Sequence, residues 1–168
     1  MKVAVLGGGP AGLYFAISMK LRDVAHDVTV IERNRADDTF GWGVVLSDET
    51  LDNLARNDPK SAESIRAHFA YWDDIAVVHK GTRTLSTGHG FCGIGRKMLL
   101  QLLQARALEL GVKIEFSTEA APVQDYMAAY DLVVASDGLN SRARTTFAEI
   151  FKPDIDMRKC KFVWLGTH

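Results

Sequence analysis

Short apolar runs alternate with a glycine-rich segment over the first 33 residues of the chain. Lys2–Leu6 and Val28–Ile31 have the length and composition of buried strands. Between them, Gly7–Gly12 precedes a helical pattern that runs from Leu13 to about Arg22. The pattern therefore predicts strand, glycine turn, helix and strand in succession, which is a βαβ unit.

The residue types in the glycine segment favour a particular chemistry. Gly7 allows a sharp turn, and Gly9 lets backbone N–H groups approach a pyrophosphate with no Cβ in the way. Pro10 suits the first helical position, and Gly12 permits close packing of the helix on the strand. Glu32 ends the second strand, where its carboxylate can accept hydrogen bonds from two ribose hydroxyls and repel a 2′-phosphate. The segment predicts a dinucleotide site, with a purely structural turn as the alternative, and does not distinguish FAD from NAD.

Periodic patterns after residue 40 predict further helices and strands. The expected helices run from Ser47 or Asp48 to about Arg56, from Lys60 to about Phe69, from Arg96 to Gly111, over Asp125–Ala129, and from Ser141 to about Phe151. The expected strands are a hairpin pair and three single runs: Ile75–His79, Thr82–Ser86, Val112–Phe116, Leu132–Ala135 and Cys160–Leu165. Because Leu132–Ala135 is continuously apolar, we expect a central parallel strand covered on both faces.

Polar residues at two of these elements indicate contact with a ligand. Arg96 opens its helix at the positive end of the helix dipole, where a cation is disfavoured by about 0.3–1 kcal/mol. A bound phosphate would relieve this cost, and so would a surface carboxylate. Asp137 and Gly138 follow Leu132–Ala135, at the carboxyl end of a strand, where ligands bind in open α/β sheets.

Composition excludes several classes of protein. The 168 residues are 47% hydrophobic and 24% charged, as in a globular chain of about one domain. The formal net charge of −1 gives no bulk attraction to nucleic acid or to an anionic membrane, and no apolar run is long enough to cross a bilayer. Cys92 and Cys160 share no metal-binding spacing with the five histidines. We therefore expect a cytoplasmic protein with two free thiols, no metal, no nucleic-acid partner and no membrane partner.

Four motifs occur in order along the chain. They are Gly7-x-Gly9-x-x-Gly12 with Glu32-Arg33, Gly41-x-Gly43-x-x-Leu46-Ser47, Arg96-x-x-Leu99, and Asp137-Gly138-x-x-Ser141-x-x-Arg144. Together they resemble the group A flavin-dependent aromatic hydroxylases, which are single-component flavoprotein monooxygenases. The last motif is the most specific, and it separates this family from plain NAD dehydrogenases. The overall sequence is most similar to the N-terminal part of the salicylyl-CoA 5-hydroxylases and 2-aminobenzoyl-CoA monooxygenase-like proteins.

The resemblance implies FAD as cofactor, NADH or NADPH as reductant, and O₂ and a small aromatic molecule, which could be a CoA thioester, as substrates. In this family the reduced flavin forms a C4a-hydroperoxide that hydroxylates the ring. The resemblance assigns Glu32 to the adenosine ribose of FAD, Arg96 to the ribose–phosphate region, and the Asp137-Gly138 turn to the pyrophosphate and to NAD(P)H use. The complete set of implied cofactor-binding residues is Gly7, Gly9, Pro10, Ala11, Gly12, Glu32, Arg33, Leu46, Ser47, Arg96, Asp137 and Gly138.

The same resemblance implies a Rossmann-like α/β fold with a parallel central sheet. It places an FAD-binding domain over residues 1–153, with an inserted hairpin at 72–87, and the start of a substrate-binding sheet at 154–168. The family's second Gly-Asp motif and most of its substrate-binding sheet are missing. We therefore expect a truncated chain that is inactive alone and holds no catalytic acid, base or nucleophile. The alternatives are an FAD oxidoreductase that does not hydroxylate and a non-catalytic dinucleotide-binding module.

Overall fold

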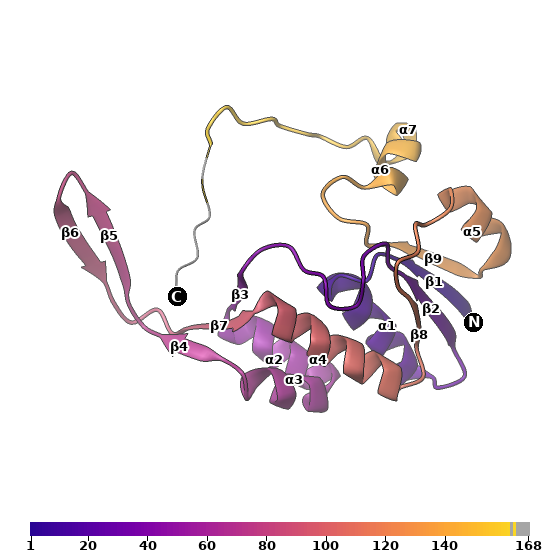
Figure 1. Ribbon diagram of the computed structural model, residues 1–168, viewed down its shortest axis with the longest axis horizontal. Coiled ribbons are helices and arrows are strands. Elements are labelled where there is room, and N and C mark those ends of the chain that lie inside the picture. The colour runs from indigo at the N-terminus through magenta and orange to yellow at the C-terminus, as the bar shows by residue number, and fades with distance from the viewer. Residues whose placement is uncertain (162, 164–168) are drawn as a thin grey trace.

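The computed structural model describes residues 1–161 and 163, which form a parallel sheet, an antiparallel sheet and a hairpin, with helices around them (Figure 1). The strands are β1 (Lys2–Leu6), β2 (Asp27–Ile31), β3 (Gly43–Leu46), β4 (Ala70–Trp72), β5 (Ile75–His79), β6 (Thr82–Ser86), β7 (Phe91–Gly95), β8 (Lys113–Glu115) and β9 (Leu132–Ala135). The helices are α1 (Pro10–Arg22), α2 (Asp48–Asn57), α3 (Pro59–Arg66), α4 (Arg96–Glu109), α5 (Val123–Ala129), α6 (Arg142–Thr146) and α7 (Ala148–Phe151).

The parallel sheet has the strand order β8-β2-β1-β9. Its register aligns the carboxyl ends of the strands, because Leu6 pairs with both Ile31 and Ala135, and Ile31 pairs with Glu115. The four segments that follow these strands therefore leave the sheet at the same edge. This edge is where a parallel α/β sheet binds its ligands.

The two central strands are buried because their side chains alternate between two apolar layers. On one face, Val3 and Val5 of β1 belong to the same cluster as Leu13 and Ile17 of α1. On the opposite face, Ala4 and Leu6 of β1 and Ile31 of β2 pack against Val123, Tyr126 and Tyr130 of the α5 region. Apart from its first residue, each of these two strands is fully buried.

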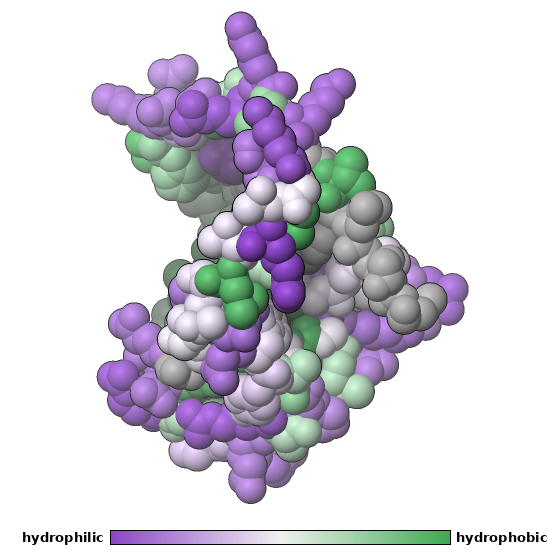
Figure 2. Space-filling view, turned by 90° about the vertical axis from the view of Figure 1, so that its left-hand side faces the viewer, coloured by the Kyte–Doolittle hydropathy of each residue, from purple (hydrophilic) through white to green (hydrophobic). Residues whose placement is uncertain are grey.

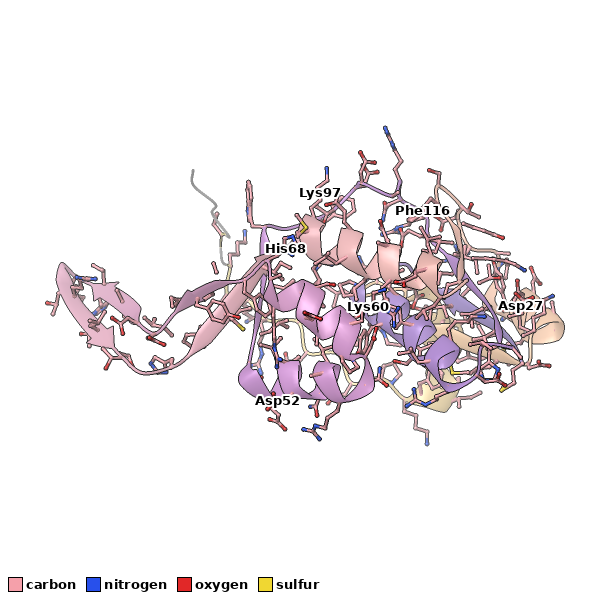
Figure 3. All side chains as sticks on the ribbon, turned by 90° about the horizontal axis from the view of Figure 1, so that it is seen from below. Asp27, Asp52, Lys60, His68, Lys97 and Phe116 are labelled. Atoms are coloured by element: carbon pink, nitrogen blue, oxygen red, sulfur yellow. The ribbon has the colours of Figure 1, made fainter. Side chains whose placement is uncertain are left out.

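The antiparallel sheet has the order β3-β7-β4, and the α2–α3 pair and α4 lie beside it (Figure 1). A buried ion pair joins the N-cap residue of α3 to α4: Arg106 donates to Asp58 from Nε at 2.9 Å and from Nη2 at 3.0 Å. Ser61 Oγ donates to the same carboxylate at 2.6 Å, and Lys60 pairs with Glu109 beside it (Figure 3). Burial alone would raise the pKa of Asp58, but the bonds from Arg106 and Ser61 outweigh it and hold the pKa below its ordinary value.

The β5–β6 hairpin projects away from the rest of the molecule as an arm (Figure 1). All ten of its strand residues are exposed, including Val77 and Val78. Figure 2 shows this end of the molecule, where hydrophobic residues lie in separate small groups among polar ones. No helix in the described part of the chain is long and apolar enough to cross a membrane.

The structure confirms most of the expected elements and differs from the sequence analysis at three points. The strand Leu132–Ala135 is an edge strand, and its residues are half-buried or exposed, because no strand of the described chain pairs beyond it. The expected helix from Ser141 to about Phe151 is two short helices separated at Phe147. Strands β3, β4 and β7 were not expected at all. The expected strand Cys160–Leu165 lies partly outside the described residues and stays a prediction.

Candidate dinucleotide site

The glycine turn between β1 and α1 leaves no room for a side chain at Gly7 and Gly12. Gly7 has φ +109°, and its N–H donates to the Ile31 carbonyl oxygen at 2.8 Å. A Cβ on Gly7 would lie 2.4 Å from the Ser136 carbonyl oxygen, and one on Gly12 would lie 2.1 Å from the Gly7 carbonyl oxygen. A Cβ on Gly9, by contrast, would have no described neighbouring atom within 4 Å. The turn is thus tightly packed on the protein side and open at Gly9.

Ser136 fixes this turn from the neighbouring strand, and sequence reasoning gave it no role. Its hydroxyl lies 2.9 Å from the Gly7 carbonyl oxygen and 3.1 Å from the Leu6 carbonyl oxygen, so its single proton is shared between two acceptors. Its backbone N–H also donates to the Leu6 carbonyl oxygen, at 2.8 Å. The signal for Ser136 was its position directly after an apolar run of strand type, immediately before Asp137.

The carboxylate of Glu32 is fixed by three N–H groups of its own chain. Oε2 accepts from the Gly8 backbone N–H at 2.6 Å. Oε1 accepts from the Asn34 backbone N–H at 2.8 Å and from Asn34 Nδ2 at 2.7 Å. A carboxylate has about four acceptor positions, so about one is left for a ligand. This geometry suits one ribose hydroxyl rather than the two that the sequence analysis expected.

A cavity of about 320 Å³ opens at the carboxyl edge of the parallel sheet. Seven of the twelve residues that the motifs assign to a cofactor line it: Gly7, Gly9, Glu32, Arg33, Arg96, Asp137 and Gly138. Pro10, Ala11 and Gly12 form the first turn of α1, directly after this wall. Leu46 and Ser47 do not line the cavity, because they lie at the end of β3 and at the N-cap of α2.

Arg96 brings a buried, unsatisfied donor to the wall of the cavity. Its backbone N–H donates to the Trp42 carbonyl oxygen at 3.0 Å, which holds the start of α4 in place. Its Nε is buried and has no hydrogen-bond partner among the described residues. An unsatisfied buried donor is costly, and a charged one more so, unless a ligand supplies the acceptor. The guanidinium therefore fits an anionic group in the cavity.

Asp137 lines the cavity and also accepts hydrogen bonds from the backbone that follows it. Its Oδ2 accepts from the backbone N–H of Arg142 at 2.7 Å and from that of Ala143 at 3.3 Å, at the N-terminus of α6. Burial would raise the pKa of Asp137, but hydrogen bonds involving Ser141, Ala143 and Arg142 outweigh it and lower the pKa. The carboxylate is thus ionised and bonded to the first two backbone N–H groups of α6, whose N-cap is Ser141, so it orders the wall of the cavity formed by this loop.

The cavity also has walls that the motifs did not identify. They are formed by the loop after β8 and by the start of α6, and comprise residues 118–123 together with Asn140, Arg142, Ala143 and Thr146. The cavity as a whole fits FAD: an open glycine turn at a helix N-terminus for phosphate, a fixed carboxylate for ribose, and an unpaired guanidinium for an anion.

Comparison with known proteins agrees with this geometry. The family described as "FAD binding domain" matches residues 1–153. Salicyloyl-CoA 5-hydroxylase from Streptomyces sp is 46% identical over 99% of this chain and 32% of its own length. Protodeoxyviolaceinate monooxygenase from Chromobacterium violaceum is 31% identical over 99% of this chain and 45% of its own length. The chain therefore spans less than half the length of these curated relatives.

The fold agrees as well. A solved structure of 2-methyl-3-hydroxypyridine-5-carboxylic acid oxygenase superposes with a TM-score of 0.61 at 26% identity, covering 71% of this chain and 32% of that one. The family match over most of the chain, the glycine turn and the fixed Glu32 carboxylate agree with one another. The chain therefore belongs to the FAD-binding domain family of the group A flavin-dependent aromatic hydroxylases.

Proposed function

We propose that this chain is the FAD-binding part of an NAD(P)H-dependent monooxygenase that hydroxylates an aromatic ring carried as a CoA thioester. The observation that carries the proposal is the 46% identity with salicyloyl-CoA 5-hydroxylase over 99% of the chain. The substrates of the whole protein would be this aromatic thioester, O₂ and NADH or NADPH. Two cysteines with no disulfide or metal spacing support a cytoplasmic location.

The residues that line the cavity have separate tasks in this proposal. The N-terminus of α1 opens on the cavity at Gly9, so its N–H groups and partial positive charge would bind the pyrophosphate of FAD. Glu32 would accept from the adenosine ribose, and Arg96 would donate to the ribose–phosphate region. Asp137 would act through α6, whose backbone N–H groups it holds at the cavity wall.

FAD, when bound, supplies the electron transfer from NAD(P)H and the chemistry of oxygen, while the chain binds and orients it. Leu46, at the end of β3, and Ser47, at the N-cap of α2, lie outside the cavity and are proposed to meet the flavin end of the cofactor. The division into an FAD-binding domain over 1–153, with the arm at 72–87, and a further sheet from 154 onwards is part of the same proposal. We place no catalytic acid, base or nucleophile in this chain.

The first test is the visible absorption spectrum of the purified chain, before and after addition of FAD. We expect the two absorption bands of bound flavin. A protein that takes up no FAD would overturn the proposed cofactor role of this chain.

The second test uses the longer protein of which we propose this chain is a part. NADH and NADPH oxidation is measured with salicyloyl-CoA and with free salicylate, and the products are analysed by mass spectrometry. We expect the thioester to stimulate oxidation and to gain one oxygen atom. Flavin reduction that yields only peroxide would instead indicate an FAD oxidoreductase that does not hydroxylate.

A further inference from the structure

An ion pair crosses the cavity between two walls that are distant in the sequence. Arg142 Nη1 donates to Glu119 Oε1 at 2.9 Å and to the Ala120 carbonyl oxygen at 3.2 Å. Glu119 and Ala120 belong to the loop after β8, whereas Arg142 begins α6, 23 residues further along the chain. Both charged side chains line the cavity. None of the sequence motifs includes either of them.

The two residues of this pair lie in the segments that follow the two edge strands of the parallel sheet. In the strand order β8-β2-β1-β9, the loop that carries Glu119 follows one edge strand, and the turn before Arg142 follows the other. The glycine turn after β1 and Glu32 after β2 lie between them along the same edge. The pair therefore connects the two ends of the carboxyl edge across the segments that would hold a dinucleotide.

Arg142 is held firmly enough to form such a connection. Its backbone N–H donates to Asp137 Oδ2 at 2.7 Å, and Asp137 itself follows β9. The chain of contacts thus runs from the end of β9 through Asp137 and Arg142 to Glu119 and Ala120 at the end of β8.

We propose that Glu119 and Arg142 form a clasp over the cavity that slows the release of bound FAD. This inference rests on the proposed function, since it assigns a further property to the same site. Opening the clasp separates the two walls and lets the nucleotide leave along the carboxyl edge. The clasp acts on retention of the cofactor and takes no part in the chemistry that the cofactor supplies.

The exposure of the pair determines the size of the effect. The side chains of Arg142 and Glu119 are 61% and 64% exposed, so water and salt screen their attraction. Breaking an exposed pair of this kind corresponds to about a two- to fivefold faster release of the ligand that it retains. Raising the ionic strength should also speed the release of the ligand, because screening weakens the ion pair.

A different role for Arg142 makes a different prediction. If its guanidinium left Glu119 and bound a phosphate of FAD directly, loss of Arg142 would weaken binding, whereas loss of the Glu119 charge would not. In the clasp, loss of either partner speeds release, and loss of Arg142 has the larger effect because it also removes the bond to the Ala120 carbonyl oxygen. Glu119→Gln is therefore the variant that separates the two roles.

The experiment loads the protein with FAD and follows flavin release after dilution by the rise in flavin fluorescence. It compares Glu119→Gln and Arg142→Gln at low and high salt. Asp27→Asn is the matched control, because Asp27 pairs with Lys113 at 2.9 Å at the opposite edge of the same sheet (Figure 3). Circular dichroism of each variant checks that the fold is retained.

We expect both cavity variants to release FAD about two- to fivefold faster than the wild type at low salt, and Asp27→Asn to be unchanged. High salt should speed release from the wild type and have little further effect on the two variants. Unchanged release in Glu119→Gln would overturn the clasp while leaving FAD binding intact. A wild type that takes up no FAD would instead overturn the proposed function on which the clasp depends.

Discussion

The backbone N–H of Gly8 donates a hydrogen bond to Glu32 Oε2 at 2.6 Å, so the acid at the end of β2 supports the glycine turn that follows β1. The two residues are so close that a Cβ on Gly8 would lie 2.9 Å from Glu32 Cβ. The turn and the acid are therefore one rigid unit before any ligand arrives. Such preorganisation lowers the ordering cost that binding would otherwise carry.

Gly12→Ala should destabilise the fold. Although Ala is favoured over Gly in a helix by about 1 kcal/mol, its Cβ would lie 2.1 Å from the backbone oxygen of Gly7 and 2.5 Å from Ser136 Oγ. We expect a net loss of about 1–3 kcal/mol in the free energy of unfolding, because the strand and helix must move apart. Urea unfolding followed by circular dichroism measures it. An increase in stability would contradict this close approach.

Gly9→Ala should weaken the binding of FAD much more than it destabilises the fold. Its Cβ meets no described neighbouring atom within 4 Å, and the residue has φ −72°, so the fold should lose at most about 1 kcal/mol, the cost of Ala in place of Gly at a helix N-cap. The added methyl group projects where the cofactor phosphates are proposed to lie, and we expect a loss of about 1–3 kcal/mol in binding, or roughly 5- to 150-fold in the Kd for FAD. Fluorescence titration with FAD measures the Kd. Gly12→Ala is the comparison variant, because its effect is expected on the stability of the fold.

The site divides into a part that sequence reasoning could reach and a part that it could not. The glycine turn and Glu32 are predictable because they flank a helix joining adjacent strands, so local spacing brings them together. The walls at Glu119 and Arg142 depend on which strands form the two edges of the sheet, and strand order is set by tertiary packing. The same cause made β9 appear central, since its apolar run does not reveal its neighbours.

The antiparallel sheet escaped prediction for a different reason. Strand β7 contains Gly93 and Gly95, which weaken any local preference for a strand. A Cβ on Gly93 would lie 3.0 Å from the ring of Trp72 in β4, so glycine lets the two strands pack with the ring in its present position. Pairing with β3 and β4, rather than local propensity, makes this segment extended.

Arg96→Gln should reduce affinity for FAD without weakening the fold. A hydrogen bond to a charged group contributes about 1.5–3 kcal/mol, which corresponds to about a 10- to 150-fold increase in Kd. Because Arg96 lies at the N-terminus of α4, removing its charge should leave the stability of the unliganded protein equal or slightly higher.

Lys97→Gln is the control for Arg96. Lys97 is exposed, has the same charge in the same helical turn and does not line the cavity (Figure 3). Isothermal titration with FAD should give an unchanged Kd for Lys97→Gln. Equal losses in the two variants would mean that general charge, rather than the buried Nε of Arg96, attracts the cofactor.

Asp58→Ala should be far more damaging than removal of an exposed carboxylate. Asp58 is 2% exposed and pairs with Arg106 through two bonds, so its loss leaves a poorly solvated guanidinium with only the exposed Glu109 as a partner, at a cost of about 3 kcal/mol. Asp52→Ala is the control, because Asp52 pairs with Arg66 at 3.4 Å on the outside of the molecule (Figure 3). That variant should lose at most about 1 kcal/mol, and comparable losses by urea unfolding would contradict the importance of burial.

Asp137→Asn should loosen α6 and do so in a pH-dependent way. The folded-state pKa of Asp137 is lowered, so its stabilising effect is complete above the unfolded value of about 3.9 and is lost as the pH falls through the folded value. At neutral pH we expect the variant to be less stable by about 0.3–1 kcal/mol, because the Asn oxygen still accepts a hydrogen bond but the favourable negative charge at the N-terminus of α6 is lost. The difference from the wild type should shrink below about pH 4, where the wild-type carboxylate also becomes protonated. Urea unfolding from pH 7 to pH 3 measures it, and a difference that stayed constant over this range would show that the ionised carboxylate is not what holds the N–H groups of α6.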